Sequence, residues 1–235
     1  MGVSIIACTN RPGFIRNLFA NYSRQRYAAK ELIVIVNNDS ASLQPYRRLA
    51  ATHKQARVYR VPAKFSLGAC LNFAVARSRY PYIAKFDDDD YYAPYYLTDC
   101  LSAFKRTGAD IVGKRTHFMY LQGSRKLLLR FPHYEHRYVD VLPGATLVVK
   151  RHVFRLVKFP NRSVGEDDLF CKRSKAKGFR IYSAGRHNFV AMRRKNSRNH
   201  TWIISDKTLI AHHKTIGRIR NVNRYVQRKP GRTGP

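Results

Sequence analysis

The chain has 235 residues, enough for one large α/β domain with a full hydrophobic core and rather few for two independent domains. It carries 45 lysines and arginines against 14 acidic residues, and the formal charge of +31 must attract an anionic partner. No apolar run reaches the roughly 18 to 20 residues of a membrane-spanning helix, and no signal-peptide pattern opens the sequence, so we expect a cytoplasmic protein. Nucleic acid, an anionic membrane surface, a polyanionic polymer and a nucleotide substrate remain open as partners.

Short apolar runs alternate with stretches of helical spacing through the first half of the chain. The runs predict buried strands, and the stretches between them predict helices. Strands joined by helices favour a mostly parallel central sheet flanked by helices, which gathers ligands at the carboxyl ends of its strands. The predicted strands span residues 3–8, 32–36, 57–61 and 82–86, and the predicted helices span residues 14–27, 67–77 and 95–106.

Polar residues follow three of these strands. Residues 9–11 follow the first strand, residues 37–40 follow the second, and four consecutive aspartates at 87–90 follow the strand at 82–86. All three groups are therefore expected at the ligand-binding edge of the sheet.

The second half of the chain is less periodic and predicts hairpins and loops that surround a substrate. Strands are expected from Ile111 and over residues 142–149, and a helix follows Gly165. The stretch from 214 to 235 holds seven basic residues and no acid, so we predict a loosely ordered basic tail there.

The four cysteines, Cys8, Cys70, Cys100 and Cys171, are far apart and form no CxxC pair. Their spacing indicates neither a zinc site nor a disulfide framework. We predict four reduced residues of the core.

Asp87, Asp88, Asp89 and Asp90 repel one another, so they stay ionised only where water or cations compensate their charge. Magnesium and manganese prefer carboxylate oxygens and commonly bind through one or two of them, with substrate phosphates as further ligands. In an extended segment alternate side chains share a face, which pairs Asp87 with Asp89. We predict that this pair binds a divalent metal. The alternative is a solvated acidic turn that begins the next helix.

A second acidic group, Glu166, Asp167 and Asp168, follows Gly165. A carboxylate here would serve as a general base if it lay within hydrogen-bond reach of an attacking hydroxyl. The alternative is a set of first-turn acids on an ordinary helix.

His200 stands beside the only tryptophan, Trp202, and follows the basic group at 193–195. Imidazole is a plausible further metal ligand, and the neighbouring cations suit diphosphate oxygens. The alternative is a histidine that only packs against Trp202. His212 and His213 are rival candidates.

Five segments together resemble family 2 glycosyltransferases of the GT-A fold, over residues 3 to about 210. Each segment is weak alone, and their order and spacing are specific. They read VSIIACTNRPGFIRNL, ELIVIVNNDS, SLGACLNFAVARS, YIAKFDDDDYY and VGEDDLFCKRSKAKGFRIY. The later segment MRRKNSRNHTW further resembles a bacterial subgroup that includes spore-associated and cell-surface-polymer transferases.

The resemblance implies a single GT-A (Rossmann-like) domain over residues 1–213. Residues 1–112 would form its nucleotide-binding half and residues 113–213 its acceptor-binding half, followed by the basic tail at 214–235. The enzyme would move a sugar, with inversion, from a UDP- or TDP-sugar to a hydroxyl acceptor such as a cell-surface or spore-surface glycan. Mn²⁺ or Mg²⁺ would be its cofactor.

The resemblance also implies roles for individual residues. Asp87 and Asp89 would be the DxD pair, with Asp89 on the metal, and His200 a further metal ligand. Asp167 would be the catalytic base, with Glu166 as its neighbour. The residues expected to bind the nucleotide are Thr9, Asn10, Arg11, Asn37, Asn38, Asp39, Asn72, Asp87 and Asp88.

One departure from the family pattern concerns the donor base. Family members usually carry an aspartate where Asn37 stands, and this aspartate accepts a hydrogen bond from the uracil ring nitrogen. Asparagine offers both a donor and an acceptor and can still bind a pyrimidine edge, without the charge.

Two rival interpretations come from other functional classes. A nucleic-acid-binding protein would explain the charge and the many aromatic residues, but it leaves the two acidic groups unexplained, so we do not expect nucleic acid as a partner. A transferase fold without activity would act as a basic structural or coat component. We assign the basic surface to an anionic membrane face or a polyanionic acceptor.

Overall fold

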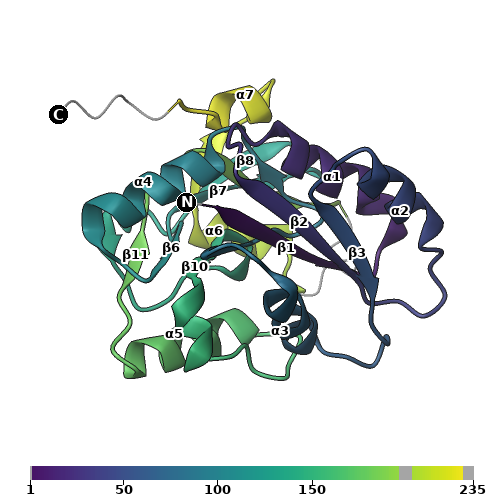
Figure 1. Ribbon diagram of the computed structural model, residues 1–235. Helices are drawn as coiled ribbons and strands as arrows, with labels where there is room; N and C mark the ends of the chain where they lie inside the picture. Colours follow the sequence, from purple (N-terminus) through teal and green to yellow (C-terminus); the bar gives the residue numbers. More distant parts are fainter. Residues whose placement is uncertain (1, 196–202, 230–235) are drawn as a thin grey trace.

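A computed structural model describes residues 2–195 and 203–229, which form two β-sheets and the helices that cover them (Figure 1). The larger sheet has the order β3-β2-β1-β4-β10-β6-β11-β9, and its strands β3, β2, β1 and β4 are mutually parallel. The predicted class, mixed α/β with a central sheet flanked by helices, is confirmed. The strands are β1 (Val3–Thr9), β2 (Lys30–Val36), β3 (Ala56–Arg60), β4 (Tyr82–Lys85), β6 (Ile111–Gly113), β9 (Arg137–Tyr138), β10 (Val148–Lys150) and β11 (Ile181–Ser183).

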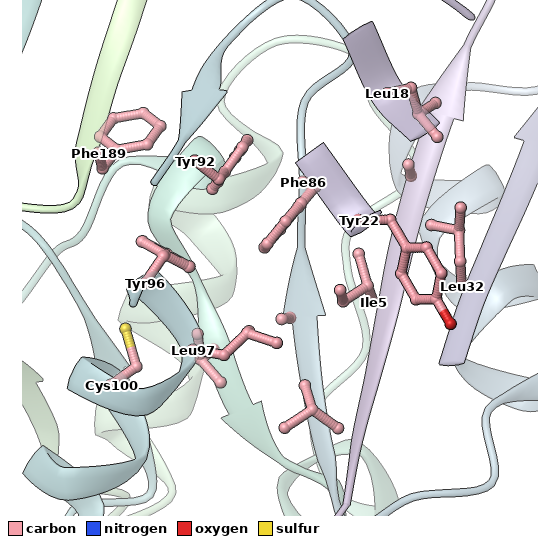
Figure 2. Close-up of a cluster of buried hydrophobic side chains, with 14 of the residues drawn as sticks. Ile5, Leu18, Tyr22, Leu32, Phe86, Tyr92, Tyr96, Leu97, Cys100 and Phe189 are labelled. Atoms are coloured by element: carbon pink, nitrogen blue, oxygen red, sulfur yellow. The ribbon is translucent and has the colours of Figure 1, made fainter. Parts of the chain in front are cut away.

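Both faces of the larger sheet are buried, which explains its continuous apolar strands. Ile5 and its alternate neighbours pack under α1 and α4, as Figure 2 shows, whereas Ile6 and Ile33 pack against α3 and α5. The helices on the first face are α1 (Ile15–Arg24), α2 (Gln44–Ala51) and α4 (Tyr96–Thr107), and those on the second face are α3 (Leu67–Arg77) and α5 (Glu166–Ala176).

The smaller sheet has the order β13-β8-β7-β12-β5 and was not foreseen as a separate sheet. Leu209 of α6 (Asp206–His212) packs on one face, and Val222 and Val226 of α7 (Val222–Val226) pack on the other. The strands are β5 (Tyr91–Tyr92), β7 (His117–Leu121), β8 (Lys126–Arg130), β12 (Phe189–Arg193) and β13 (Lys214–Gly217).

Two sequence-based expectations are wrong. Residues 214–229 are not a loosely ordered tail, because β13 pairs with β8 and the side chain of Val226 is fully buried. The strand expected over 142–149 is only β10, because Pro143 and Gly144 open a 3₁₀ turn, η2 (Gly144–Thr146), in which the Thr146 N–H bonds the Pro143 carbonyl at 2.9 Å. The other two 3₁₀ turns are η1 (Pro12–Phe14) and η3 (Arg151–Arg155).

The topology brings the polar segments to one edge of the larger sheet. The strands β1, β2, β4 and β6 all run toward this edge, because β10 is antiparallel to both β4 and β6. The η2 turn, which precedes β10, lies at the same edge. No helix in the described part of the chain is long and apolar enough to cross a membrane. All four cysteines are free, as predicted, and three of them are buried.

Candidate active site

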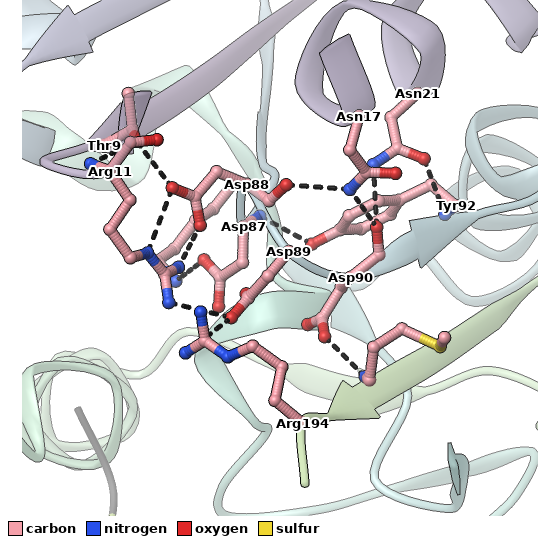
Figure 3. Close-up of polar contacts among 12 residues, drawn as sticks. Thr9, Arg11, Asn17, Asn21, Asp87, Asp88, Asp89, Asp90, Tyr92 and Arg194 are labelled. Carbon is pink, nitrogen blue, oxygen red and sulfur yellow. Dashed lines mark hydrogen bonds and ion pairs between the residues drawn. The ribbon is translucent and has the colours of Figure 1, made fainter. Parts of the chain in front are cut away.

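The four aspartates after β4 turn toward different neighbours, and Arg11 binds two of them (Figure 3). The Arg11 Nη1 donates to Asp89 Oδ2 at 2.9 Å, and its Nε donates to Asp88 Oδ2 at 3.3 Å. The Thr9 hydroxyl also donates to Asp88, at 2.5 Å. Burial raises the pKa of Asp88, and the Arg11 charge opposes this increase. Asp88 therefore anchors the loop after β1, while Asp89 stays partly accessible.

The expected pairing of Asp87 with Asp89 on one face does not hold, because residues 88–90 form a bend and not an extended strand. Asp88 and Asp89 share Arg11, whereas Asp87 contacts Lys85. The two carboxylates expected on the metal nevertheless lie two residues apart at the same sheet edge.

A second guanidinium approaches Asp89 from the other half of the chain. Arg194, just beyond β12, lies 3.6 Å from Asp89 Oδ2. The guanidiniums of Arg11 and Arg194 lie 4.8 and 4.9 Å from the centre of the Phe14 ring. Figure 3 shows both groups at the Asp89 carboxylate. Two cations thus share the Asp89 carboxylate.

Lys85 contacts the first acidic group, lies within electrostatic range of the second, and is not indicated by the sequence motifs. Its buried Nζ donates to Asp87 Oδ1 at 2.5 Å. Burial lowers its pKa, but the charges of Asp87, Glu166 and Asp167 more than offset that effect and raise the pKa above its ordinary value. Burial raises the pKa of Glu166 to about 7, against the opposing charge of Lys85. The sequence feature that could have identified Lys85 is its place as a single lysine in the apolar strand YIAKF.

Tyr92 makes a second connection across the site. Its buried hydroxyl accepts a hydrogen bond from the Asp87 N–H at 2.8 Å and donates one to the Ala145 carbonyl, in η2, at 2.7 Å. The ring stacks on Phe86, with 3.7 Å between the ring centres. The backbone of the acidic segment is therefore fixed to the turn that contacts the second acidic group. The sequence interpretation had assigned no role to Tyr92.

Asp90 is a structural member of the acidic segment. Its Oδ1 accepts from the Met192 N–H at 2.8 Å, and its carbonyl accepts from Asn17 and Asn21 at 2.9 and 2.8 Å. Burial, followed by the charges of Asp89 and Asp87, raises the pKa of Asp90 well above its ordinary value. These contacts fix the end of the acidic segment to α1 and β12.

The second acidic group begins α5, after Gly165 in the left-handed conformation. Asp167 Oδ2 accepts from the Gly144 N–H at 2.6 Å, which directs this carboxylate toward η2. Asp168 instead pairs with Lys172 at 2.7 Å on the exposed side of the helix. Asp167 therefore lies against η2 at the sheet edge, whereas Asp168 fits the alternative of a first-turn surface acid.

The loops after β1 and β2 are joined at the expected nucleoside position. Asn38 Nδ2 donates to the Asn10 carbonyl at 3.0 Å, and Asp39 Oδ1 accepts from the Ala63 N–H at 3.1 Å. Asn37 Nδ2 donates to the Pro62 carbonyl at 2.6 Å. Within the described residues the Asn37 amide oxygen accepts no hydrogen bond.

Asn72 contacts the segment that leads to α5, unlike the other residues expected to bind the nucleotide. Its amide donates to the Phe159 carbonyl at 2.9 Å and accepts from the Phe159 N–H at 3.0 Å. Both ends of the amide are therefore engaged, and the geometry gives Asn72 the role of fastening the segment that leads to α5.

His200 lies outside the described residues. Of its two rivals, His212 is exposed and His213 accepts from Arg130 Nε at 3.2 Å in the smaller sheet. Among the residues that the structure describes, no three His, Cys, Asp or Glu side chains are grouped to hold a metal ion. A magnesium or manganese ion needs only one or two protein carboxylates when phosphates complete the coordination, and the carboxylates of Asp87 and Asp89 are both partly accessible.

Comparison with known proteins places this architecture in a family. Residues 4–159 match Glycosyl transferase family 2. The chain belongs to this family. Its glycosyltransferase class and GT-A fold agree with the resemblance found in the sequence segments. No curated protein matches the chain in a sequence search.

Solved structures of glycosyltransferases share the fold. The structure of S. aureus TarS 1–349 in complex with UDP-GlcNAc superposes with a TM-score of 0.64 and 17% identity, over 87% of this chain and 62% of that one. The mannosyltransferase PcManGT from Pyrobaculum calidifontis, in complex with GDP-Man and Mn²⁺, gives 0.64 and 17%, over 84% and 58%. The chain thus spans about 60% of these two crystallised chains, and 37% of the longer crystallised chain of S. aureus TarS. At this identity the likeness shows the fold alone, and the spore-associated resemblance stays a prediction.

Proposed function

We propose that the protein is a metal-dependent, inverting glycosyltransferase that moves a sugar from a nucleoside diphosphate sugar, with UDP or TDP as the nucleotide, to a hydroxyl acceptor. The observation that carries this proposal is the connection of two acidic groups at one sheet edge. Lys85 contacts Asp87 and its charge acts on Glu166, and Tyr92 joins the Asp87 backbone to the turn that contacts Asp167. In this proposal the first acidic group serves the donor and the second supplies the base.

The donor would bind across the loops after β1 and β2. The Asn37 amide oxygen would accept the ring N–H of a pyrimidine, which favours uridine or thymidine nucleotides. Arg11 and Arg194 would exchange contacts with Asp89 for contacts with the diphosphate, since charge-assisted hydrogen bonds to phosphate are strong. Exchange of this kind frees the Asp89 carboxylate as the donor arrives.

Asp89, together with Asp87, would hold Mn²⁺ or Mg²⁺. The bound metal would neutralise charge that develops on the departing diphosphate. The exposed fraction of the Asp87 side chain is 36%, so this carboxylate is open to a ligand on its accessible side.

Asp167 would act as the general base. The Gly144 N–H holds one oxygen of its carboxylate and so fixes the direction of the group. The acceptor hydroxyl would lose its proton to Asp167 as its oxygen bonds the anomeric carbon. The bond from that carbon to the diphosphate would break on the opposite face, which inverts the configuration. General-base assistance typically contributes about 10²- to 10⁴-fold in rate.

Two variants test the assignment of roles. In Asp89→Asn we expect metal-dependent binding of nucleotide sugar to be lost. In Asp167→Asn we expect donor binding to persist while transfer falls by about a hundredfold or more. Asp168→Asn is the matched control, since Asp168 faces solvent one residue away. Donor binding is followed by calorimetric titration and transfer by product formation over a panel of nucleotide sugars. Normal transfer by both variants would show the roles to be wrong.

A further inference from the structure

The loop between η3 and α5 exposes two large apolar side chains to solvent. Leu156 and Val164 are 66% and 58% exposed. Among the large apolar residues that the structure describes, only Ile203 is also more than half exposed. Apolar groups that gather on a surface mark interaction sites more often than single ones do, so this loop is a candidate contact surface.

The two side chains stay outside the core because other apolar residues of the loop already fill the space beneath it. The rings of Phe154 and Phe159 pack against each other and against Phe170 of α5, with 4.4 to 5.7 Å between the ring centres. The side-chain amide of Asn72, in α3, donates to the Phe159 carbonyl at 2.9 Å and accepts from its N–H at 3.0 Å. The loop is thus fixed between α3 and α5, and its exposed apolar groups are held at the surface.

Three exposed cations alternate with these apolar groups along the loop: Arg155, Lys158 and Arg162. No acid occurs between residues 151 and 165. In the part of the chain that the structure describes, none of the three cations forms an ion pair. The half-exposed acid that follows, Asp168, is paired with Lys172 at 2.7 Å. The charge of the loop is therefore available to an external anion.

The loop ends at the sheet edge that carries the candidate site. Val164 lies one residue before the Gly165 cap of α5. In the first turn of this helix, Asp167 accepts from the Gly144 N–H of η2. A partner that docks on the loop therefore lies beside the edge of the sheet where the acidic groups meet.

We propose that residues 155–164 form a docking surface for an anionic lipid bilayer. Leu156 and Val164 enter the boundary between headgroups and acyl chains, and the three cations contact the anionic headgroups. Nucleic acid fits this surface less well, because it is bound through phosphate contacts and stacking on aromatic rings, and the aromatic rings of this loop are buried. The inference goes beyond the proposed function and does not rest on it.

The test is sedimentation of the full chain with vesicles, without nucleotide sugar. The vesicles contain phosphatidylglycerol and phosphatidylcholine in equal parts, and vesicles of phosphatidylcholine alone are the neutral match. We expect binding to the anionic vesicles, little binding to the neutral ones, and weaker binding as salt is added. Leu156→Ser should weaken binding by about fivefold or more, because an inserted apolar side chain is lost. Ile203→Ser is the matched control, since Ile203 is also 66% exposed and lies outside the loop.

A second pair of variants tests the charge of the surface. Arg155→Gln/Arg162→Gln should weaken binding to the anionic vesicles by about tenfold or more. Arg47→Gln/Arg48→Gln removes the same charge from exposed positions of α2, which covers the opposite face of the larger sheet, and should change binding by less than about twofold.

Three results would overturn the docking surface: no binding to anionic vesicles, equal binding by Leu156→Ser and Ile203→Ser, or equal weakening by the two double variants. A single-stranded oligonucleotide that binds more tightly than the anionic vesicles, and loses binding in Arg155→Gln/Arg162→Gln, would assign the loop to nucleic acid instead. Thermal unfolding of each variant is measured alongside. If Leu156→Ser unfolds well below the native protein, Val164→Ser replaces it with the same expected loss of binding.

Discussion

Lys85 shows how one buried side chain can set the electrostatics of the whole site. A buried ammonium group is costly unless carboxylates compensate it, and Lys85 has Asp87 in contact and Glu166 nearby. Because Lys85 belongs to β4, its position is as rigid as the sheet. One fixed charge therefore contacts Asp87 and acts at longer range on Glu166.

Glu166 gives a prediction for stability against pH. Its folded-state pKa of about 7 lies above the ordinary value of 4.5. Between these values the unfolded chain is ionised while the folded chain keeps its proton, so the wild type loses stability as pH rises through this window. Glu166→Gln cannot titrate. Its stability relative to wild type should therefore increase by up to about 3 kcal/mol between about pH 5 and about pH 8, measured by urea unfolding.

Glu135→Gln is the control for this measurement. The pKa of Glu135 is lowered, because the contacts with Arg186 outweigh the effect of burial. Its titration window therefore lies below the ordinary value, and its relative stability should be flat above about pH 6. A flat response in Glu166→Gln as well would contradict the raised pKa.

Residue types and order indicated the members of the site but not their contacts. The sequence placed Asp87 to Asp90 and Glu166 to Asp168 at the ends of elements, and the structure brings both groups to one edge. The sequence could not show that Arg11 binds Asp88 and Asp89. This contact depends on a bend, whereas the sequence pattern predicted the alternating side chains of an extended strand. Lys85 was overlooked because a single lysine in a strand is usually a solvated edge residue.

At the scale of elements, the docking of α3 positions the segment that carries the proposed base. The Gly68 N–H donates to the Arg162 carbonyl at 3.0 Å, and Ser66 Oγ donates to Asn161 Oδ1 at 2.6 Å. A Cβ on Gly68 would lie 1.8 Å from the Pro160 carbonyl oxygen. The helix and the loop before α5 therefore approach each other at a distance that only glycine allows.

Gly68→Ala should separate α3 from this loop. We expect a loss of about 1–3 kcal/mol in unfolding free energy, the usual cost of overpacking, together with slower transfer at unchanged donor binding. Gly13→Ala is the control, since a Cβ there meets nothing within 4 Å. Equal stability of the two variants, measured by denaturant unfolding, would show that the close approach has no energetic role.

Helices and strands with a clear pattern of apolar residues were predicted accurately from the sequence. The helix at 67–77 was predicted with the observed bounds, and the first two strands were close, because uninterrupted apolar runs specify strands buried on both faces. The smaller sheet was missed as a unit, since it pairs β5 with β12, far along the chain. Distant pairing of this kind leaves no local signal. The helix α2 was missed because it buries only Tyr46.

At the scale of the whole molecule, residues near the end of the described chain contact the acidic segment that lies in its first half. The strand β12 pairs with β5, next to the acidic segment, and Arg194 beyond it reaches Asp89. Val226 of α7 packs under the smaller sheet. The C-terminal segment is thus part of the domain that supports the candidate site.

Val226→Ala tests this integration. Removing two buried methyl groups should lower the free energy of unfolding by about 2 kcal/mol. Val164→Ala is the matched control, because Val164 is 58% exposed and should change stability by less than about 0.5 kcal/mol. Thermal or urea unfolding gives both values. A neutral Val226→Ala would indicate that α7 only rests on the surface.

The most direct test of the central claim is a calorimetric titration of the unmodified protein with a panel of nucleoside diphosphate sugars, in Mn²⁺ and again in excess chelator. The carboxylates Asp87 and Asp89 and the cations Arg11 and Arg194 predict that a uridine or thymidine diphosphate sugar binds with Mn²⁺ and binds far more weakly when the metal is removed. No binding of any member of the panel, with or without metal, would contradict the claim.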